Sequence, residues 1–573
     1  MSEQKKKSLF RKVRTIVKGD TEFDFSRLKE KPKEDEPKRE GVRRGAELLT
    51  REKAAALAAR AIPNDDKGIA WGGIRIPSES HFIFIGQTGS GKTVSIKLLM
   101  SEALQEVGQG RRAVIYDPKG ELVPWLYALL GDNAPIKILN PFDDRCAMWE
   151  IAKDITDRAH AQTIASVFCP DFSDMKDAEF FQRAARDLIS GVMESFILTD
   201  IEREEAGEDR LDWHFWDVCL AIRDRNTIRE ILGKHWSTKN LIELYVDRSK
   251  DNNDVLATVA SKMRELEIIA GAWHDPEKKR ERVSLKDFRD SKTGEILLLG
   301  DHAEAGAPIK ALNRFFFQRL TQVLLDSDAP EVFEPRTWII LDEFQRLGLT
   351  GIDDLFQTGR SKGIRMVLGF QNLESVEKAY DSELIPKILM SQAKAVAFLR
   401  CIGNTAESAA KYLGMSEVWR ESVNKGQSRS IVNFEIQEDH SIQTAIAEEL
   451  VVRAEEFYKR LPEAGPVNGV WGFYFASAVG DPYLHGYQWN EVKHFAKLKS
   501  LKEEHSHFMK RKGRRYQFLT EWEAEDRKRL GLSRVIEEAT TSHIISEPKR
   551  EEPKKSANSI LDALRERGFQ VDK

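Results

Sequence analysis

The residues with the most specific chemistry are Gly86–Thr93, which read GQTGSGKT. They follow the apolar run HFIFI, which predicts a strand, and precede VSIKLLMSEAL, whose spacing predicts a helix. This context matches the phosphate-binding loop motif G-x-x-x-x-G-K-[ST]. Lys92 would neutralise the β- and γ-phosphate oxygens, and the Thr93 hydroxyl would hold Mg²⁺. The backbone N–H groups that would surround the phosphates belong to Gly86, Gln87, Thr88, Gly89, Ser90 and Gly91.

A second motif, Trp338–Glu343, is an apolar run that ends in two carboxylates. Downstream of a phosphate-binding loop, Asp342 would lie beside Thr93 and position Mg²⁺ as a second metal-site residue. Glu343 would then orient and deprotonate the attacking water. Taken alone, the same pair also fits a solvated turn at the end of a strand.

A third motif runs from Arg360 into the predicted strand Arg365–Phe370 and ends at Gln371. The Gln371 amide could contact a γ-phosphate and report its loss, and Arg360 could stabilise transition-state charge in a neighbouring subunit. The plainer alternatives are a surface salt-bridge arginine and a glutamine that caps the strand. The run Asp117–Glu121 (DPKGE) closes another strand and predicts a turn at the ligand edge of the sheet, with no chemistry assigned.

The elements that must position these residues form an α/β pattern. Apolar runs alternate with helical segments, which predicts a mainly parallel sheet covered on both faces. A nearly strand-free stretch interrupts it and predicts an inserted all-alpha domain, with Phe180, Phe181, Ala184, Ala185 and Leu188 as one apolar stripe. The expected divisions are 1–60, 61–150 with 286–480, 151–285, and 481–573. The predicted strands are His81–Ile85, Ala113–Asp117, Ile136–Leu139, Ile296–Gly300, Thr337–Asp342, Arg365–Phe370, Ala395–Leu399 and Val470–Phe475.

The chain resembles the type IV secretion coupling proteins, the TraG/TraD-type conjugation ATPases, over about 68–480. The resemblance is carried by five segments in this order: HFIFIGQTGSGKT, DPKGE, AEFFQRAARDLI, WIILDEF and TGRSKGIRMVLGFQNL. The resemblance implies a RecA-like P-loop NTPase that forms a homo-hexamer and hydrolyses ATP with Mg²⁺. It also implies DNA, relaxase and channel components as partners at the cytoplasmic face of a bacterial inner membrane. By resemblance, Lys92 is the nucleotide lysine, and Asp342 with Glu343 is the Walker B pair. Arg360 is the arginine finger, and Gln371 is the γ-phosphate sensor.

The chain departs from that family because no run is apolar for long enough to cross a bilayer, whereas typical members carry N-terminal transmembrane helices. Residues 1–18 contain seven Lys or Arg against one Glu, with apolar residues at helical spacing. This pattern predicts peripheral contact with an anionic membrane, and a solvated tail is the alternative. Two linkers, 28–45 and 547–555, and a short terminal helix near Ser559 are also expected.

The composition of the chain excludes some classes of protein but does not identify one function. The net charge of −4 excludes a uniformly basic DNA coat, and four separated cysteines argue against a zinc site or disulfide scaffold. Residues 493–515 carry nine Lys or Arg interleaved with aromatic residues, which favours nucleic acid, although a solvated helix face explains it equally well. Three functions stay open: a DNA-translocating coupling ATPase, a receptor for secreted effector proteins, and a HerA/FtsK-like DNA-processing motor.

Overall fold

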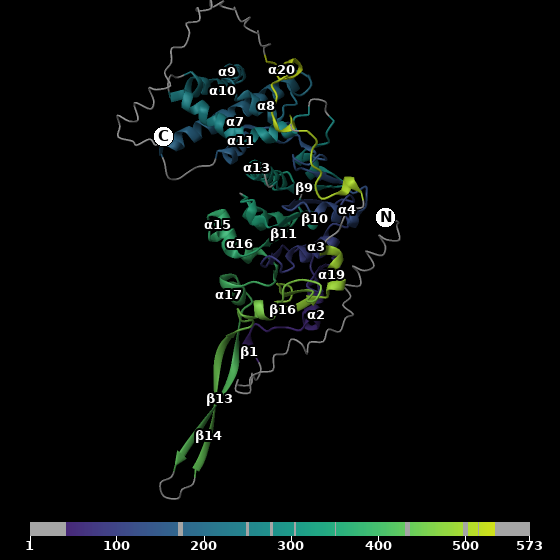
Figure 1. Cartoon of the computed structure of the whole chain (residues 1–573), viewed down its shortest axis with the longest axis vertical. Helices are drawn as coiled ribbons and strands as arrows, with labels where there is room; N and C mark the ends of the chain where they lie inside the picture. The colour runs from purple at the N-terminus through teal and green to yellow at the C-terminus, as the bar shows by residue number, and fades with distance from the viewer. Residues whose placement is uncertain are drawn as a thin grey trace, which may run out of the picture. The chain divides into compact units, whose positions relative to one another are not determined.

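The computed structural model divides into two units, Met1–Glu523 and Ala524–Lys573. It describes residues 42–169, 176–247, 251–275, 279–302, 305–329, 331–349, 351–429, 436–496, 502–513 and 515–532. The described part of the second unit contains α20 (Ala524–Arg529). All elements discussed below belong to the first unit (Figure 1).

A nine-stranded sheet forms the centre of the first unit, in the order β16-β15-β12-β4-β11-β10-β5-β9-β6. Its strands are β4 (Phe82–Ile85), β5 (Arg112–Asp117), β6 (Ile136–Ile138), β9 (Ile296–Gly300), β10 (Val332–Asp342), β11 (Lys362–Phe370), β12 (Ala395–Phe398), β15 (Val470–Ala476) and β16 (Tyr483–Tyr487). The seven strands from β12 to β6 pair in parallel, and β15 and β16 are antiparallel at one edge. The predicted mainly parallel sheet is therefore confirmed.

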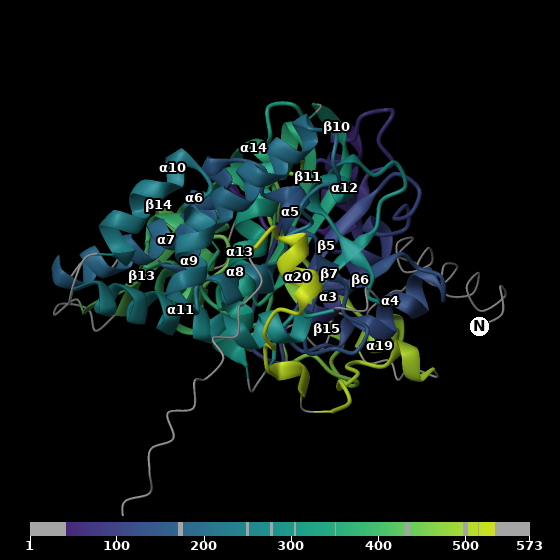
Figure 2. The ribbon, with the colours of Figure 1, turned by 90° about the horizontal axis from the view of Figure 1, so that it is seen from above.

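Both faces of the central strands are buried, which explains why their sequences are continuously apolar. On one face, Phe82 and Phe84 pack with residues of α3 (Lys92–Ala103) and α4 (Leu122–Leu130). The intervening residues Ile83 and Ile85 are fully buried on the other face. α4 also lies beside α19 (Trp489–Ala496), with the Trp125 and Phe495 ring centroids 6.3 Å apart (Figure 2).

The remaining helices of this part of the chain connect consecutive strands. They are α2 (Arg51–Ala61), α13 (Gly306–Leu324), α14 (Ile352–Thr358), α15 (Leu373–Tyr380), α16 (Leu384–Gln392), α17 (Gly403–Tyr412) and α18 (Glu456–Lys459). Two short strand pairs, β2 (Ile69–Trp71) with β3 (Ile74–Ile76) and β7 (Met148–Trp149) with β8 (Arg282–Val283), lie outside the main sheet.

Between β7 and β8, most of the described residues are helical and none is in a strand. The helices are α5 (Ile151–Asp154), α6 (Arg158–Phe168), α7 (Lys176–Glu205), α8 (Phe215–Ala221), α9 (Arg225–Leu232), α10 (Trp236–Leu241), η2 (Ile242–Val246) and α11 (Asp251–Trp273). Ala184, Ala185 and Leu188 of α7 are fully buried, as the apolar stripe predicts. The two phenylalanines near the start of the helix are exceptions, because Phe181 is only partly buried and the Phe180 side chain is 50% exposed.

The two ends of this helical insertion meet at Asp154. Its carboxylate is fully buried and accepts hydrogen bonds from the Trp149 indole at 2.5 Å and the Ser284 hydroxyl at 2.9 Å. The backbone N–H groups of Leu285 and Lys286 donate to it at 2.7 and 3.0 Å. Asp154 therefore joins the entry into the insertion to α12 (Leu285–Asp290), where the chain returns.

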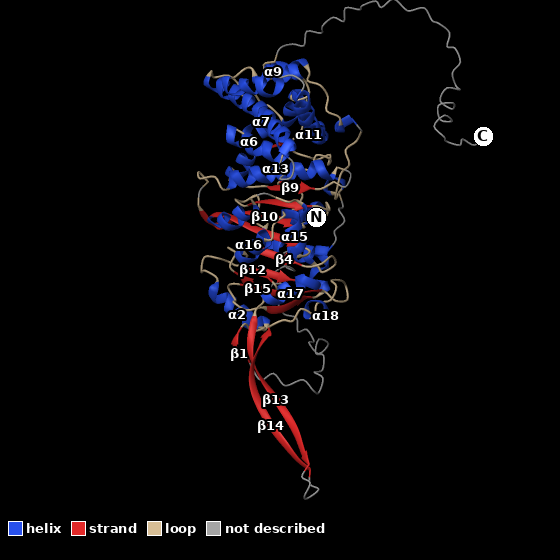
Figure 3. Ribbon diagram, turned by 90° about the vertical axis from the view of Figure 1, so that its left-hand side faces the viewer, coloured by secondary structure: helices blue, strands red, loops and turns tan. Residues whose placement is uncertain are grey.

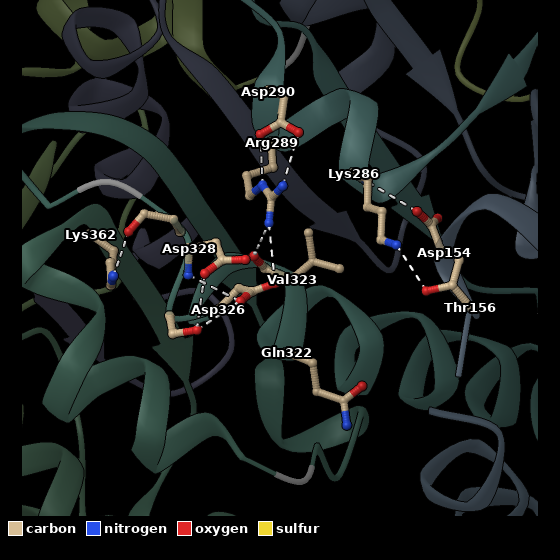
Figure 4. A network of polar contacts seen from close by, with 12 residues as sticks. Asp154, Thr156, Lys286, Arg289, Asp290, Gln322, Val323, Asp326, Asp328 and Lys362 are labelled. Atoms are coloured by element: carbon tan, nitrogen blue, oxygen red, sulfur yellow. Dashed lines mark hydrogen bonds and ion pairs between the residues drawn. The ribbon is translucent and has the colours of Figure 1, made fainter. Parts of the chain in front are cut away.

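A wider polar network continues from this junction toward the amino end of β11 (Figure 4). Lys286 Nζ donates to Thr156 Oγ1 at 3.0 Å, and Arg289 pairs with Asp326 at 3.4 Å. Lys362, the first residue of β11, donates to the Ala329 carbonyl at 2.5 Å. The loop after α13 is thus fixed both to α12 and to the strand that follows Arg360.

Two features were not expected from the sequence. β16 extends the sheet past 480, where we expected it to end. A long antiparallel hairpin, β13 (Met415–Arg429) and β14 (Ile436–Leu450), pairs with β1 (Val42–Gly45) in a separate sheet. Figures 1 and 3 show α7 to α11 beyond the β9 side of the main sheet and this hairpin beyond its β16 side. β1 also corrects the interpretation of 28–45 as a linker throughout.

Helices within the described ranges are all too short or too polar to cross a membrane. The predicted amphipathic segment 1–18 and the terminal helix near Ser559 lie outside the described residues.

Candidate active site

The loop Gly86–Gly91 connects β4 to α3 at the carboxyl edge of the sheet. Gly91 has φ +92°, and a Cβ there would lie 2.6 Å from Val470 Cγ1, so a larger residue would be both strained and crowded. The Gly86 N–H donates to the Phe370 carbonyl at 3.2 Å, and the Gln87 N–H donates to the Arg400 carbonyl at 3.0 Å. Neighbouring strands therefore fix the start of the loop from both sides.

Lys92 and Thr93 begin α3 and converge on Asp342 at the end of β10. The Thr93 hydroxyl donates to Asp342 Oδ2 at 2.6 Å, and Lys92 Nζ lies 3.8 Å from Asp342 Oδ1. Burial lowers the pKa of Lys92, against the opposing attraction of Asp342 and Glu343. Ser90 Oγ and Asp342 Oδ1 are buried and have no hydrogen-bond partner within the described residues. These atoms are thus available to a ligand at the head of α3.

The strand register explains how residues so far apart in sequence meet. β10 lies between β5 and β11, with Leu341 opposite Tyr116 and Asp342 opposite Gly369. A Cβ on Gly369 would lie 2.8 Å from Asp342 Oδ1. The glycine therefore leaves room for the carboxylate to reach α3.

Glu343 follows in a left-handed backbone conformation, with φ +54°. Such a conformation is uncommon for a residue other than glycine and often marks a functional position. The Glu343 carboxylate is flanked by two cations, with Lys119 Nζ at 3.5 Å and Arg346 Nη1 at 3.5 Å. Glu343 therefore contacts two cations, whereas the neighbouring Asp342 contacts the residues at the start of α3.

Gln371 directly follows β11 at this same edge. Its neighbour Phe370 is opposite Ile85 in β4, and Gly369 is opposite Asp342. Gln371 therefore lies between the start of the phosphate-binding loop and the Asp342 strand, where the sequence predicts it.

Arg360 lies at the opposite edge of the sheet from these residues. It belongs to η4 (Gly359–Ser361), just before β11 begins, and β11 runs parallel to β4 and β10. Nine residues of extended chain separate the two edges by roughly 25 Å. Arg360 forms an ion pair with Glu79, which also contacts Lys394 at 2.8 Å. The structure therefore does not bring Arg360 to the phosphate-binding loop of its own chain.

The DPKGE run forms the turn between β5 and α4, as expected. Asp117 accepts hydrogen bonds from the Leu122 N–H at 2.6 Å and the Lys119 N–H at 3.2 Å. Burial raises the pKa of Asp117, and these backbone donors oppose the shift. The turn leaves Lys119 exposed beside Glu343.

Sequence reasoning missed a loop, 461–469, that lies against the phosphate-binding loop. The Ala464 N–H donates to the Gly89 carbonyl at 2.9 Å. Arg400 donates hydrogen bonds to the carbonyl of Leu461 at 3.0 Å, where this loop begins, and to that of Tyr458 in α18 at 2.7 Å. No local pattern indicates this contact, because its partners are hundreds of residues apart in the chain.

The family model described as "Type IV secretion-system coupling protein DNA-binding domain" matches residues 69–470, more than two thirds of the chain. Coupling protein TraD of Escherichia coli (strain K12) is 24% identical over 346 residues, which is 60% of this chain. The match spans 45% of the length of TraD.

The fold also resembles solved structures of the plasmid coupling protein TrwB. The unbound form of TrwBdeltaN70 has a TM-score of 0.60 at 18% identity, covering 82% of this chain and 97% of that one. TrwB with ADP and Mg²⁺ has a TM-score of 0.60 at 17% identity, covering 83% and 98%. TrwB with the non-hydrolysable ATP analogue ADPNP has a TM-score of 0.59 at 18% identity, covering 83% and 99%. The predicted RecA-like NTPase fold with an all-alpha insertion is confirmed, and the chain belongs to the type IV secretion-system coupling protein family.

Proposed function

We propose that this chain is a Mg²⁺-dependent ATPase that powers transfer of a DNA substrate through a type IV secretion channel. The observation that carries the proposal is the convergence of Lys92 and Thr93 on Asp342, with the Thr93 hydroxyl 2.6 Å from the carboxylate. The complexes of TrwB with ADP and Mg²⁺ and with an ATP analogue support the same ligands here.

The described residues fit a magnesium nucleotide. Thr93 and Asp342 would hold the metal, and the backbone of Gly86–Gly91 with Lys92 would bind the phosphates. Bound Mg²⁺ supplies charge neutralisation on the β- and γ-phosphates. The buried, unpartnered Ser90 Oγ and Asp342 Oδ1 are the polar atoms that such a ligand would satisfy.

Glu343 and Gln371, at the ends of two adjacent strands, would supply the remaining groups for ATP hydrolysis. Glu343 would accept the proton of the attacking water, and the Gln371 amide would contact the γ-phosphate. Both lie at the carboxyl edge beside the loop that binds the phosphates. In this structure Lys119 contacts Glu343 Oε1 and Arg346 contacts Glu343 Oε2, so at least one of these ion pairs has to open before the carboxylate can accept the proton.

The position of Arg360 supports a ring assembly in which each ATP site is formed by residues of two subunits. Because it lies at the far edge of the sheet, it would act on ATP bound by a neighbouring chain. The proposed assembly is a homo-hexamer, as the resemblance implies. The proposed division of the chain keeps the helical domain at 151–285 and extends the sheet domain past 480 to include β16.

The proposed substrate is a DNA strand carried by a relaxase, and the family model's description as a DNA-binding domain supports it. The test is hydrolysis by the full chain with and without a 30-nucleotide single-stranded DNA, dT30. Stimulation that disappears with added salt is expected for phosphate contacts. A chain that hydrolyses ATP but neither binds nor responds to DNA would instead be a receptor for secreted proteins.

A DNA-dependent rate alone also fits a HerA/FtsK-like motor that acts away from any channel. Co-purification of the full chain with a relaxase and channel components from its own host distinguishes the two. Recovery of the chain without them would contradict the coupling role.

We also propose that residues 1–18 bind the anionic inner face of a bacterial membrane. Their seven cations and apolar spacing support the proposal. Flotation with vesicles containing phosphatidylglycerol should decrease on deletion of 1–18 and at high salt. Unchanged flotation after the deletion would contradict it.

A further inference from the structure

A cavity of about 350 Å³ lies next to the Glu343 region, at the carboxyl ends of β5, β9 and β6. The DPKG turn borders it on one side, and Asp301 and His302 after β9 border it on another. Residues His507 and Phe508 of the C-terminal segment complete its wall. Its volume is within the range of small-ligand pockets.

This C-terminal segment is fixed to the sheet domain by specific contacts. The Met509 N–H donates to Asp143 Oδ2 at 3.2 Å, and the Asp144 N–H donates to the Met509 carbonyl at 2.8 Å. The His505 ring stacks on Tyr127 with centroids 3.8 Å apart. These contacts hold Phe508 at the cavity.

The two cations that contact Glu343, Lys119 and Arg346, either line this cavity or contact a residue that does. Lys119 lines it directly and reaches Glu343 at 3.5 Å. Arg346 contacts Glu343 and also Asp301, a cavity residue, at 3.5 Å each. A ligand in the cavity would therefore compete for the groups that hold the catalytic carboxylate.

The acidic groups of the cavity are already engaged within the protein. Asp117 accepts backbone hydrogen bonds from its own turn, and Asp143 pairs with Arg145 at 2.7 Å. Asp301 pairs with Arg346. Lys119, with a 48% exposed side chain, is thus a cation that an incoming anion can reach.

Aromatic rings line the same cavity as these groups. Phe508 is 39% exposed, and its ring centroid lies 5.9 Å from that of His302. The His302 ring stacks on Phe142 at 4.4 Å. An exposed ring and a cation in one cavity are a combination that binds single-stranded nucleic acid, through base stacking and phosphate neutralisation.

We propose that this cavity binds a nucleotide of the single-stranded substrate, and that its phosphate draws Lys119 away from Glu343 and so frees the carboxylate for catalysis. The inference rests on the proposed ATPase and DNA functions and adds the contact that couples them. Phe508 is assigned to base stacking. Lys119 is assigned to the phosphate in the loaded state and to Glu343 in the unloaded state.

Binding is tested first, without nucleotide, by fluorescence anisotropy of labelled dT30 with the full chain. Phe508→Ala should raise the Kd about fivefold or more, since base stacking on one ring contributes at least that factor. Phe518→Ala is the matched control, because Phe518 lies on the same segment, is 70% exposed and does not line the cavity. Equal Kd values for Phe508→Ala and Phe518→Ala would overturn the assignment of Phe508.

Coupling is tested by ATP hydrolysis. Lys119→Ala should raise the rate without DNA several-fold and reduce the stimulation by dT30. Lys153→Ala is the control, because Lys153 is 47% exposed and ion-paired with Glu150 but lies away from the cavity. If Lys119→Ala lowers the basal and stimulated rates alike, Lys119 only positions Glu343 and the release step is wrong.

Heparin separates a nucleotide site from a general response to polyanions. Heparin should stimulate less than dT30, and Phe508→Ala should leave the heparin response unchanged. Equal stimulation by both polymers, with Phe508→Ala affecting neither, would overturn base recognition. A wild-type chain that hydrolyses no ATP would contradict the proposed function, and the anisotropy measurement would still test the cavity.

Discussion

The Thr93 hydroxyl donates a hydrogen bond of 2.6 Å to Asp342 Oδ2 across 249 positions of the sequence. Thr93 starts α3 after β4, and Asp342 ends β10, with β11 between the two strands. The bond therefore crosses one intervening strand at the carboxyl edge of the sheet. Its atoms are those that a magnesium nucleotide would use, so ligand binding at this point should be measurable directly.

Nucleotide binding should stabilise the protein through Lys92 and Thr93. At MgADP of 100 times its Kd, the free energy of unfolding should rise by about 2.7 kcal/mol, because the ligand binds only the folded state. Lys92→Ala and Thr93→Ala should lose most of this gain, and EDTA should reduce it in the wild type. Differential scanning fluorimetry measures the shift, with Lys153→Ala as the control. The same MgADP shift in Lys92→Ala would contradict the site.

Glu343→Gln should separate binding from hydrolysis. The amide keeps the size of the side chain but cannot accept the proton of the attacking water, so kcat should fall about 100-fold or more. ATP affinity should stay within about twofold, measured by equilibrium binding of a fluorescent ATP analogue. Glu374→Gln is the control, because Glu374 lies at the same edge and contacts Thr405 at 3.1 Å. Equal hydrolysis by Glu343→Gln and the wild type would exclude Glu343 as the base.

Arg360 and Lys92 should complement each other between subunits. Arg360→Ala alone should lower kcat by about 10³-fold if it stabilises transition-state charge. Mixing it with Lys92→Ala should restore part of the rate, because some interfaces pair an intact loop with an intact arginine. An affinity tag on one variant only, with recovery of the untagged variant in the same pull-down, should verify that the rings are mixed. No recovery in verified mixed rings, together with a normal rate for Arg360→Ala alone, would leave Arg360 as a surface ion pair.

Glu79 should position Arg360 for this role. Its carboxylate contacts both Arg360 and Lys394, so Glu79→Gln should leave the arginine less restrained and lower kcat about fivefold. KM for ATP should not change, because the arginine does not bind the ground state in its own chain. Glu106→Gln, which loses a comparable exposed pair with Arg111, is the control. A fall in KM or in stability without a change in kcat would contradict a positioning role.

Asp154 should be a major determinant of stability at the base of the helical insertion. Asp154→Ala leaves four donors without their acceptor in a fully buried place, which should cost about 3 kcal/mol or more of unfolding free energy. Asp157→Ala, which removes the exposed cap of α6, should cost only about 1 kcal/mol. Urea unfolding followed by circular dichroism measures both. Equal losses would show that the junction is not held by Asp154.

The main strands and the nucleotide motif were predictable because their signals are local. A strand buried on both faces must be apolar throughout, as Phe82–Ile85 and Ile296–Gly300 are. The glycines and Lys92 must occur together in one short segment, since one loop has to surround the phosphates. The hairpin was missed because the sequences of its arms, such as Met415–Arg429, are rich in polar residues and contain no long apolar run. β16 was missed because it is short and contains His485 and Gly486.

By itself, the sequence determined which residues could bind and hydrolyse a nucleotide. The tertiary structure alone decided where they lie. The parallel register brings Thr93 to Asp342 and puts Arg360 at the opposite edge. It also places Lys119 and Arg346 on Glu343, and Phe508 at a cavity beside them. No local pattern encodes such contacts, because they depend on strand order and on packing between segments hundreds of residues apart.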